Sequence, residues 1–111
     1  MASPKKFLGE FEQRVIAAVL RLGEEAYGVS IIDSIAEPTG RKVSSGALST
    51  TLDRMERKGL VQSELGDPSP GRGMRSRRYI RVTPTGLALA RDSRAALLNL
   101  WQGIDEAYDE S

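Results

Sequence analysis

Residues 43–60, VSSGALSTTLDRMERKGL, carry the sequence feature that most constrains the fold. The segment opens with a serine pair suited to cap a helix and closes with a lysine and a glycine suited to end one. Leu48, Leu52 and Met55 fall at helical spacing on one narrow apolar face. The opposite face is small and polar at first and basic further along: Ser45, Gly46, Ser49, Thr50, Asp53, Arg54 and Arg57. The segment therefore predicts a helix, over about residues 45–58, with one buried side and one side left for a partner.

Two further helices are expected before this segment. Residues 7–22 (FLGEFEQRVIAAVLRL) show the three-and-four spacing of an amphipathic helix, which Gly23 ends. A second helix is expected from residue 29 to 35 or 36, with three isoleucines on its apolar side. Pro38 and Gly40 are expected to stop it, because proline cannot continue a helix and restricts the residue before it. Two helices joined by a tight turn, the second polar and basic outside, form a helix-turn-helix.

After the third helix, the apolar period changes to that of a strand. Residues 60–65 and 77–82 alternate, and residues 66–73 hold three glycines and two prolines, which indicates a hairpin with an irregular tip. A two-stranded sheet is not stable alone, so the hairpin must lean on the helices. Thr83 and Pro84 then suit the start of a last helix, expected to run to about Tyr108.

The predicted fold class is mostly α with a small β-hairpin, in a chain of 111 residues. Residues 1–82 are expected to form a winged helix-turn-helix domain, with the wing at about 60–82. Residues 83–111 are expected to form a C-terminal dimerisation helix packed with the N-terminal helix. Much of the apolar seam of this last helix would be exposed in a monomer, which suggests that it pairs with a second copy. The candidate interface residues are Phe7, Phe11, Leu97, Trp101, Ile104 and Tyr108.

The net charge of +1 conceals an uneven distribution. Between Arg41 and Arg81 there are ten Lys or Arg against four Asp or Glu, whereas the remainder has six against eleven. This segregation indicates a surface for a polyanion on an otherwise acidic body. The alternative is that the basic side chains only solvate a surface.

Composition excludes several function classes. The chain has no histidine and no cysteine, so it lacks the commonest general base, the commonest metal ligand and any disulfide. Catalytic triads, zinc sites and phosphate-binding loops all lack their residues, so we expect no enzyme activity, no metal and no cofactor. No apolar run is long enough to span a membrane, and residues 1–13 do not have the pattern of a signal peptide.

Three sequence blocks in order resemble the PadR-like family of winged helix-turn-helix transcriptional regulators. They are AYG at 26–28, GALSTTLDRMERKGLV at 46–61 and RRYIRVTPTG at 77–86, and the likeness extends from Leu8 to the end. The resemblance implies a homodimeric, cytoplasmic repressor that binds double-stranded DNA. The chain departs from the family pattern at Ser49 and Thr50, where relatives commonly have tyrosine and proline. Since those positions contact DNA in relatives, the target sequence cannot be transferred from them.

The candidate DNA-binding residues come from the third helix, its approach and the wing. Hydroxyls and amides at a helix start suit phosphates and base edges, although one of the two serines at 44 and 45 is expected only to cap the helix. Arg54 could instead pair with a neighbouring carboxylate, and the wing arginines could only solubilise a loop. The complete set is Arg41, Lys42, Ser44, Ser45, Gly46, Ser49, Thr50, Arg54, Arg72, Arg75, Arg77 and Arg78.

The expected mechanism is occupancy of a palindromic operator by a two-fold dimer, with release by a signal that the sequence does not identify. Trp101 is expected to anchor the dimer; the alternative, drawn from some relatives, is that it lines a pocket for a small-molecule effector. The rival function is a winged helix that binds protein instead of DNA.

Overall fold

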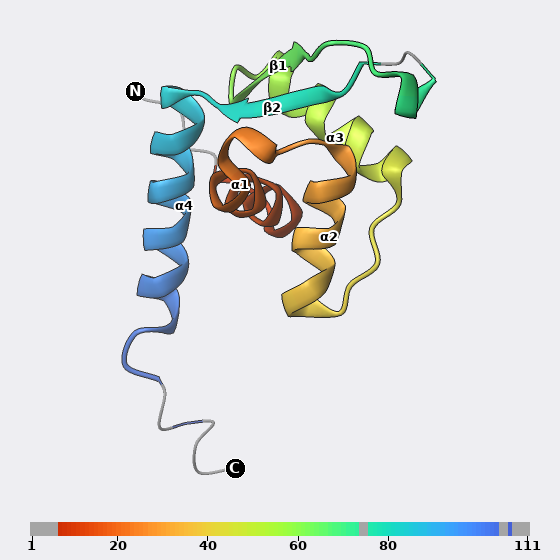
Figure 1. Ribbon diagram of the computed structural model, residues 1–111. Helices are drawn as coiled ribbons and strands as arrows, with labels where there is room; N and C mark the ends of the chain where they lie inside the picture. Colours follow the sequence, from red (N-terminus) through yellow and green to blue (C-terminus); the bar gives the residue numbers. More distant parts are fainter. Residues whose placement is uncertain (1–6, 74–75, 105–106, 108–111) are drawn as a thin grey trace.

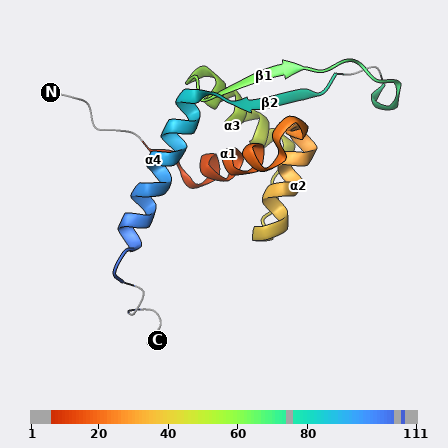
Figure 2. The ribbon, with the colours of Figure 1, turned by 60° about the vertical axis from the view of Figure 1, so that its left-hand side comes forward.

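The computed structural model describes residues 7–73, 76–104 and 107, and in these residues it shows helices and one antiparallel hairpin (Figure 1). The elements follow in the order α1 (Glu10–Leu22), η1 (Gly23–Glu25), α2 (Gly28–Thr39), α3 (Ser45–Arg57), β1 (Val61–Leu65), η2 (Pro70–Arg72), β2 (Arg78–Val82) and α4 (Pro84–Trp101). The hairpin lies across one end of the helices, and α4 runs away from it on the opposite side of α1 from α2 (Figures 1 and 2). The predicted fold class is confirmed.

The core lies where α1, α2 and α3 meet the inner face of the hairpin. The predicted apolar face of α3, formed by Leu48, Leu52 and Met55, is buried, which confirms that prediction. These side chains pack with apolar residues of the other elements: Val15, Ile16, Val19, Ile31, Ile35, Leu60, Val61 and Ile80. Burial of this face directs the opposite face of α3 away from the core.

The hairpin is fixed to the start of α2 by backbone pairing. β1 and β2 pair antiparallel over their full length. On the free edge of β2, Tyr27 forms an isolated bridge with Tyr79, and the Ile80 N–H donates to the Ala26 carbonyl at 2.9 Å. The sequence did not predict this second pairing, between β2 and the residues before α2. It holds the hairpin in a set position relative to the two helices that follow Ala26.

α2 is longer than the sequence predicted, since it runs through Pro38 to Thr39 and does not end at residue 35 or 36. Proline removes one N–H donor from a helix, but α2 ends one residue later, so the loss is confined to its last turn. Gly40 ends the helix: its φ of 66° is left-handed, and its N–H donates to the Ala36 carbonyl at 2.7 Å. Glycine, and not proline, sets this helix end.

α4 is shorter than predicted, because it ends at Trp101 and a continuous helix to about residue 108 is wrong. Gln102 has an extended backbone, and Gly103 has a left-handed φ of 81°. A left-handed residue interrupts the helical hydrogen-bond ladder, and glycine adopts this conformation without strain. Ile104 therefore lies beyond α4, and Tyr108 is outside the described residues.

The start of α4 is fixed to the end of α3. Thr83 caps α4 as predicted: its hydroxyl accepts the Gly86 N–H at 3.0 Å and donates to the Gly59 carbonyl at 2.6 Å. A Cβ at Gly86 would overlap the Leu60 carbonyl oxygen, so only glycine fits there. The backbone of α4 at Gly86 thus lies close to the backbone at Leu60, just after α3.

α4 also packs with the segment that enters α1. The Leu8 N–H donates to the Ser93 hydroxyl at 2.9 Å, and both residues are buried. Within the described part of the chain, none of the helices has the length and apolar character needed to cross a membrane.

Candidate nucleic-acid interface

The first two turns of α3 present small polar groups to solvent. Ser44 is the cap, since its hydroxyl accepts the Ala47 N–H at 3.0 Å. The residues that follow on the outer face are all exposed: Ser45, Gly46, Ser49 and Thr50. Among the described residues, no hydrogen bond or ion pair engages the hydroxyls of Ser45, Ser49 and Thr50. Their donors and acceptors are therefore available to a ligand.

Gly46 is not required by the fold. A Cβ added there would meet no heavy atom within 4 Å, and its backbone is not left-handed. Glycine in a helix costs up to about 1 kcal/mol relative to alanine. The helix would therefore be at least as stable with alanine at this position, so neither the backbone nor the packing of the described residues demands glycine here.

The second half of α3 is held by α1. The Glu12 carboxylate lies 3.9 Å from the Arg54 guanidinium and 3.7 Å from the Lys58 ammonium. One Glu12 oxygen accepts the Gly9 N–H at 3.0 Å, whereas the other is buried without a hydrogen-bond partner. The alternative that Arg54 pairs with a neighbouring carboxylate of its own helix is wrong in its partner, because the Arg54 side chain pairs with Glu12 of α1.

The second half of α3 is also held by the hairpin, through Arg78 of β2. The Arg78 guanidinium lies 3.1 Å from the Asp53 carboxylate and 3.2 Å from that of Glu56, and its Nε donates to the Ser63 hydroxyl at 2.8 Å. Ser63 returns a bond, since its N–H donates to Glu56 at 2.9 Å. Hydrogen bonding with Ser63, and then the charge of Arg78, lower the pKa of Glu56. Arg78 therefore fixes the angle between hairpin and helix.

The other predicted cations lie beside these two elements. The guanidinium of Arg41 stacks over Phe11 at 5.2 Å from the ring centre, and that of Arg77 stacks over Tyr27 at 4.1 Å. Interaction with Tyr79 raises the pKa of Arg77. The remaining members of the set are Lys42, which is exposed, Arg72, whose backbone lies in η2, and Arg75, which is outside the described residues.

The comparisons with known proteins agree with this arrangement. A family model described as the transcriptional regulator PadR-like family matches residues 16–92. The chain belongs to the PadR-like family of transcriptional regulators. It is a family of DNA-binding regulators and not of enzymes, which confirms the resemblance seen in the sequence.

Solved structures share the fold. A PadR family regulator from Eggerthella lenta is 26% identical, with a TM-score of 0.64, and the match covers 89% of this chain and 87% of that one. A transcriptional regulator from Clostridium thermocellum is 20% identical, with a TM-score of 0.70 over 86% and 89%. A PadR family regulator from Clostridium difficile is 20% identical, with a TM-score of 0.65 over 92% and 97%. A search of curated proteins found no match.

In this PadR-like chain, α4 and its neighbours expose many apolar side chains: Phe7, Leu87, Leu97, Leu98, Leu100, Trp101 and Ile104. Trp101, the largest of these side chains, is 51% exposed. The prediction that much of this helix lacks apolar cover in a single chain is therefore confirmed. Phe11 differs, because it packs partly against the core and lies under Arg41.

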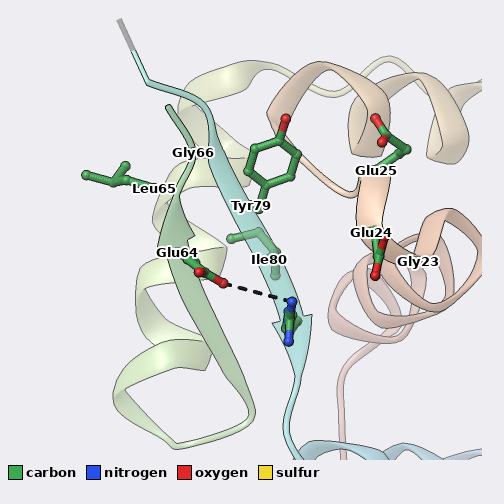
Figure 3. Close-up of a pocket in the computed structure, with 9 residues that line it drawn as sticks. Gly23, Glu24, Glu25, Glu64, Leu65, Gly66, Tyr79 and Ile80 are labelled. Carbon is green, nitrogen blue, oxygen red and sulfur yellow. Dashed lines mark ion pairs between the residues drawn. The ribbon is translucent and has the colours of Figure 1, made fainter. Parts of the chain in front are cut away.

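The side of the hairpin that faces η1 is acidic, in contrast to the basic residues described above. A hollow of about 370 Å³ lies between η1 and the strands, with the carboxylates of Glu24, Glu25 and Glu64 around Tyr79 (Figure 3). Glu64 pairs weakly with Arg81 at 4.0 Å. This acidic wall, which the sequence did not reveal, would repel phosphate.

Proposed function

We propose that this chain is a homodimeric, sequence-specific repressor that occupies an operator in double-stranded DNA. The main support is the exposed start of α3, where Gly46 has open space beside it and the hydroxyls of Ser45, Ser49 and Thr50 form no hydrogen bond with the other described residues. Hydroxyl groups and the amides of a helix N-terminus suit phosphate oxygens and base edges. An α-helix also matches the major groove in width.

The cations around this surface would supply the sequence-independent part of the affinity. Arg41 and Lys42 precede α3 and would meet phosphates, whereas the wing arginines at 72, 75 and 77 would follow the backbone or the minor groove. Arg54 and Arg78 are held by carboxylates, at 3.9 Å from Glu12 and 3.1 Å from Asp53 respectively. Their first role in this proposal is to orient α3, and any contact with DNA is secondary.

The dimer would form through α4. Pairing of two copies would cover Phe7, Leu97, Trp101, Ile104 and Tyr108, with Trp101 as the anchor. A two-fold arrangement would set the two copies of α3 about 34 Å apart, which is one turn of DNA, on a palindromic operator. Occupancy would block transcription in the cytoplasm, and an effector that changed the dimer angle would end it.

Fluorescence anisotropy tests the proposal. The protein is titrated into a labelled duplex from the promoter of its own gene and into a scrambled duplex of the same composition, across a series of salt concentrations. We expect tighter binding to the promoter and a steep loss of affinity as salt rises, because counterions are released. Equal or absent binding to both duplexes at low salt would contradict DNA recognition and favour a protein partner.

Sedimentation tests the dimer. We expect the wild-type chain to sediment as a dimer and Trp101→Ala to shift towards monomer, because burial of the indole is lost. Leu20→Ala is the matched control, since Leu20 is a similarly exposed apolar residue on α1 outside the proposed seam. An unchanged dimer in Trp101→Ala would remove Trp101 as anchor.

A further inference from the structure

A hollow of about 200 Å³ lies between the first turns of α2 and α3, next to the surface proposed to read DNA. Its apolar lining comes from Val29, Ile32, Leu48 and Leu52. Two hydroxyl side chains of α3, Ser45 and Ser49, line it as well. The hollow is therefore an apolar surface bordered by groups that can hydrogen-bond to base edges.

Val29 is the part of this lining that the fold does not explain. It is the second residue of α2, and 64% of its surface is exposed, so the core does not hold it. A β-branched side chain is also a weak helix former, so helix stability does not favour it there. Ile32 and Leu48, by contrast, have their place in or against the core.

The charges around the hollow fit DNA. Arg78 lines it, but Asp53 and Glu56 balance that charge at 3.1 and 3.2 Å. Arg77 stacks on Tyr27, the residue directly before α2, and interacts electrostatically with Glu25, but it does not line the hollow. A ligand at this hollow would thus meet an apolar floor and two hydroxyls, with the guanidinium of Arg78 beside them. A nucleotide in the major groove offers an apolar group, base-edge acceptors and a phosphate.

We propose that Val29 contacts the C5-methyl group of a thymine in the operator and so determines base preference from outside the recognition helix. The methyl group is the only apolar group that a base pair presents in the major groove, and apolar side chains read it by contact. Ser45 or Ser49 would meet the polar edge of the same or the next base. This inference rests on the proposed DNA-binding function.

The test uses the tightest duplex that the full-length protein selects from a random-sequence pool. Each thymine of one half-site is replaced in turn by deoxyuridine, which removes only the methyl group. We expect one position at which affinity falls roughly four-fold, the factor that burial of one methyl group is worth. Val29→Ala should bind thymine and deoxyuridine equally at that position, and Leu20→Ala should keep the wild-type ratio.

The outcomes separate this inference from the function on which it rests. If the protein selects no sequence from the pool, both fail. If it selects an operator but no thymine methyl affects affinity, or Val29→Ala keeps the wild-type ratio, the operator stands and this contact is overturned, which leaves the hollow to a protein partner. Thermal unfolding is the control for the fold of Val29→Ala. Replacement by alanine at an exposed helical position should not reduce stability.

Discussion

The two halves of α3 differ in their contacts with the rest of the chain. The side chains of residues 45–50, here called the reading half, are exposed on their outer face and engage no described residue there. Residues 53–58, here called the anchored half, are tied to α1 through Glu12 and to the hairpin through Arg78. The contacts of the anchored half thus hold the exposed face of the reading half in position.

This difference shows that a basic residue on α3 is not necessarily available for contact with a partner. Arg54 and Lys58 share one buried carboxylate oxygen of Glu12. Because that carboxylate is mostly buried, the two cations compensate its charge, and the contacts hold α3 against α1. Under the proposed function, the specificity of the reading half would depend on small uncharged side chains, whose reach is short and whose position must be well fixed.

The largest expected effect comes from breaking the junction behind the anchored half. Gly86→Ala would force a Cβ into the Leu60 carbonyl, just after α3. We expect a loss of about 3 kcal/mol in the free energy of unfolding, because two backbones would have to separate. Thermal or urea unfolding measures it, and an unchanged midpoint would show that α4 approaches α3 less closely than described.

Arg78→Ala should break the tie between hairpin and helix. Its partners are half-exposed, so we expect a loss of only about 1 kcal/mol in stability. The slope of DNA affinity against salt should stay unchanged if Arg78 does not contact phosphate. Lys42→Ala is the matched control: it should leave stability unchanged and reduce the salt slope by about one. The reverse pattern would exchange the roles of these two residues.

Gly46→Ala, in the reading half, should have opposite effects on stability and on affinity for the operator. The position has open space, so we expect a gain of up to about 1 kcal/mol in stability from helix propensity. Affinity for the operator should nevertheless fall, because the added methyl group stands where the DNA would approach. Unfolding and anisotropy on the same sample measure both effects. A more stable variant with unchanged affinity would show that nothing approaches Gly46.

The smallest expected effect is a dependence on pH in the anchored half. The pKa of Glu56 is lowered in the folded state by Ser63 and Arg78, so its contribution is present above the ordinary glutamate pKa of about 4.3 and is lost as pH falls through the lower folded value. The stability advantage of wild type over Glu56→Gln should therefore shrink below about pH 4. A constant difference down to acid unfolding would contradict a charged role for Glu56.

Much of this fold could be predicted from the sequence, because the deciding signals are local. The apolar spacing of α3, the caps at Ser44 and Thr83 and the alternation of the hairpin all depend on neighbours a few residues apart. The sequence predicts the ends of α2 and α4 less well, because Pro38 indicates an end before Gly40 and the apolar periodicity continues past Gly103, whereas these two glycines mark the actual ends.

The contacts of the anchored half could not be predicted in the same way. Arg54 has Asp53 and Glu56 beside it in sequence, but residues one or two apart do not face each other on a helix. Its actual partner, Glu12, belongs to another helix. Likewise, Arg78 appeared as a wing cation, and only the packing of hairpin on helix brings it to Asp53. Such pairs depend on the tertiary arrangement, which periodicity alone does not contain.

The claim that the reading half recognises DNA is tested most directly by selecting duplexes from one random pool with wild-type protein and with Ser49→Ala. The hydroxyl of Ser49 engages no other described residue, so its removal should leave folding and the salt slope unchanged. The account predicts that the variant still selects DNA but with a changed base preference at one position of each half-site. An identical preference in both proteins would contradict base reading by Ser49, and with it the division of α3 into a reading and an anchored half.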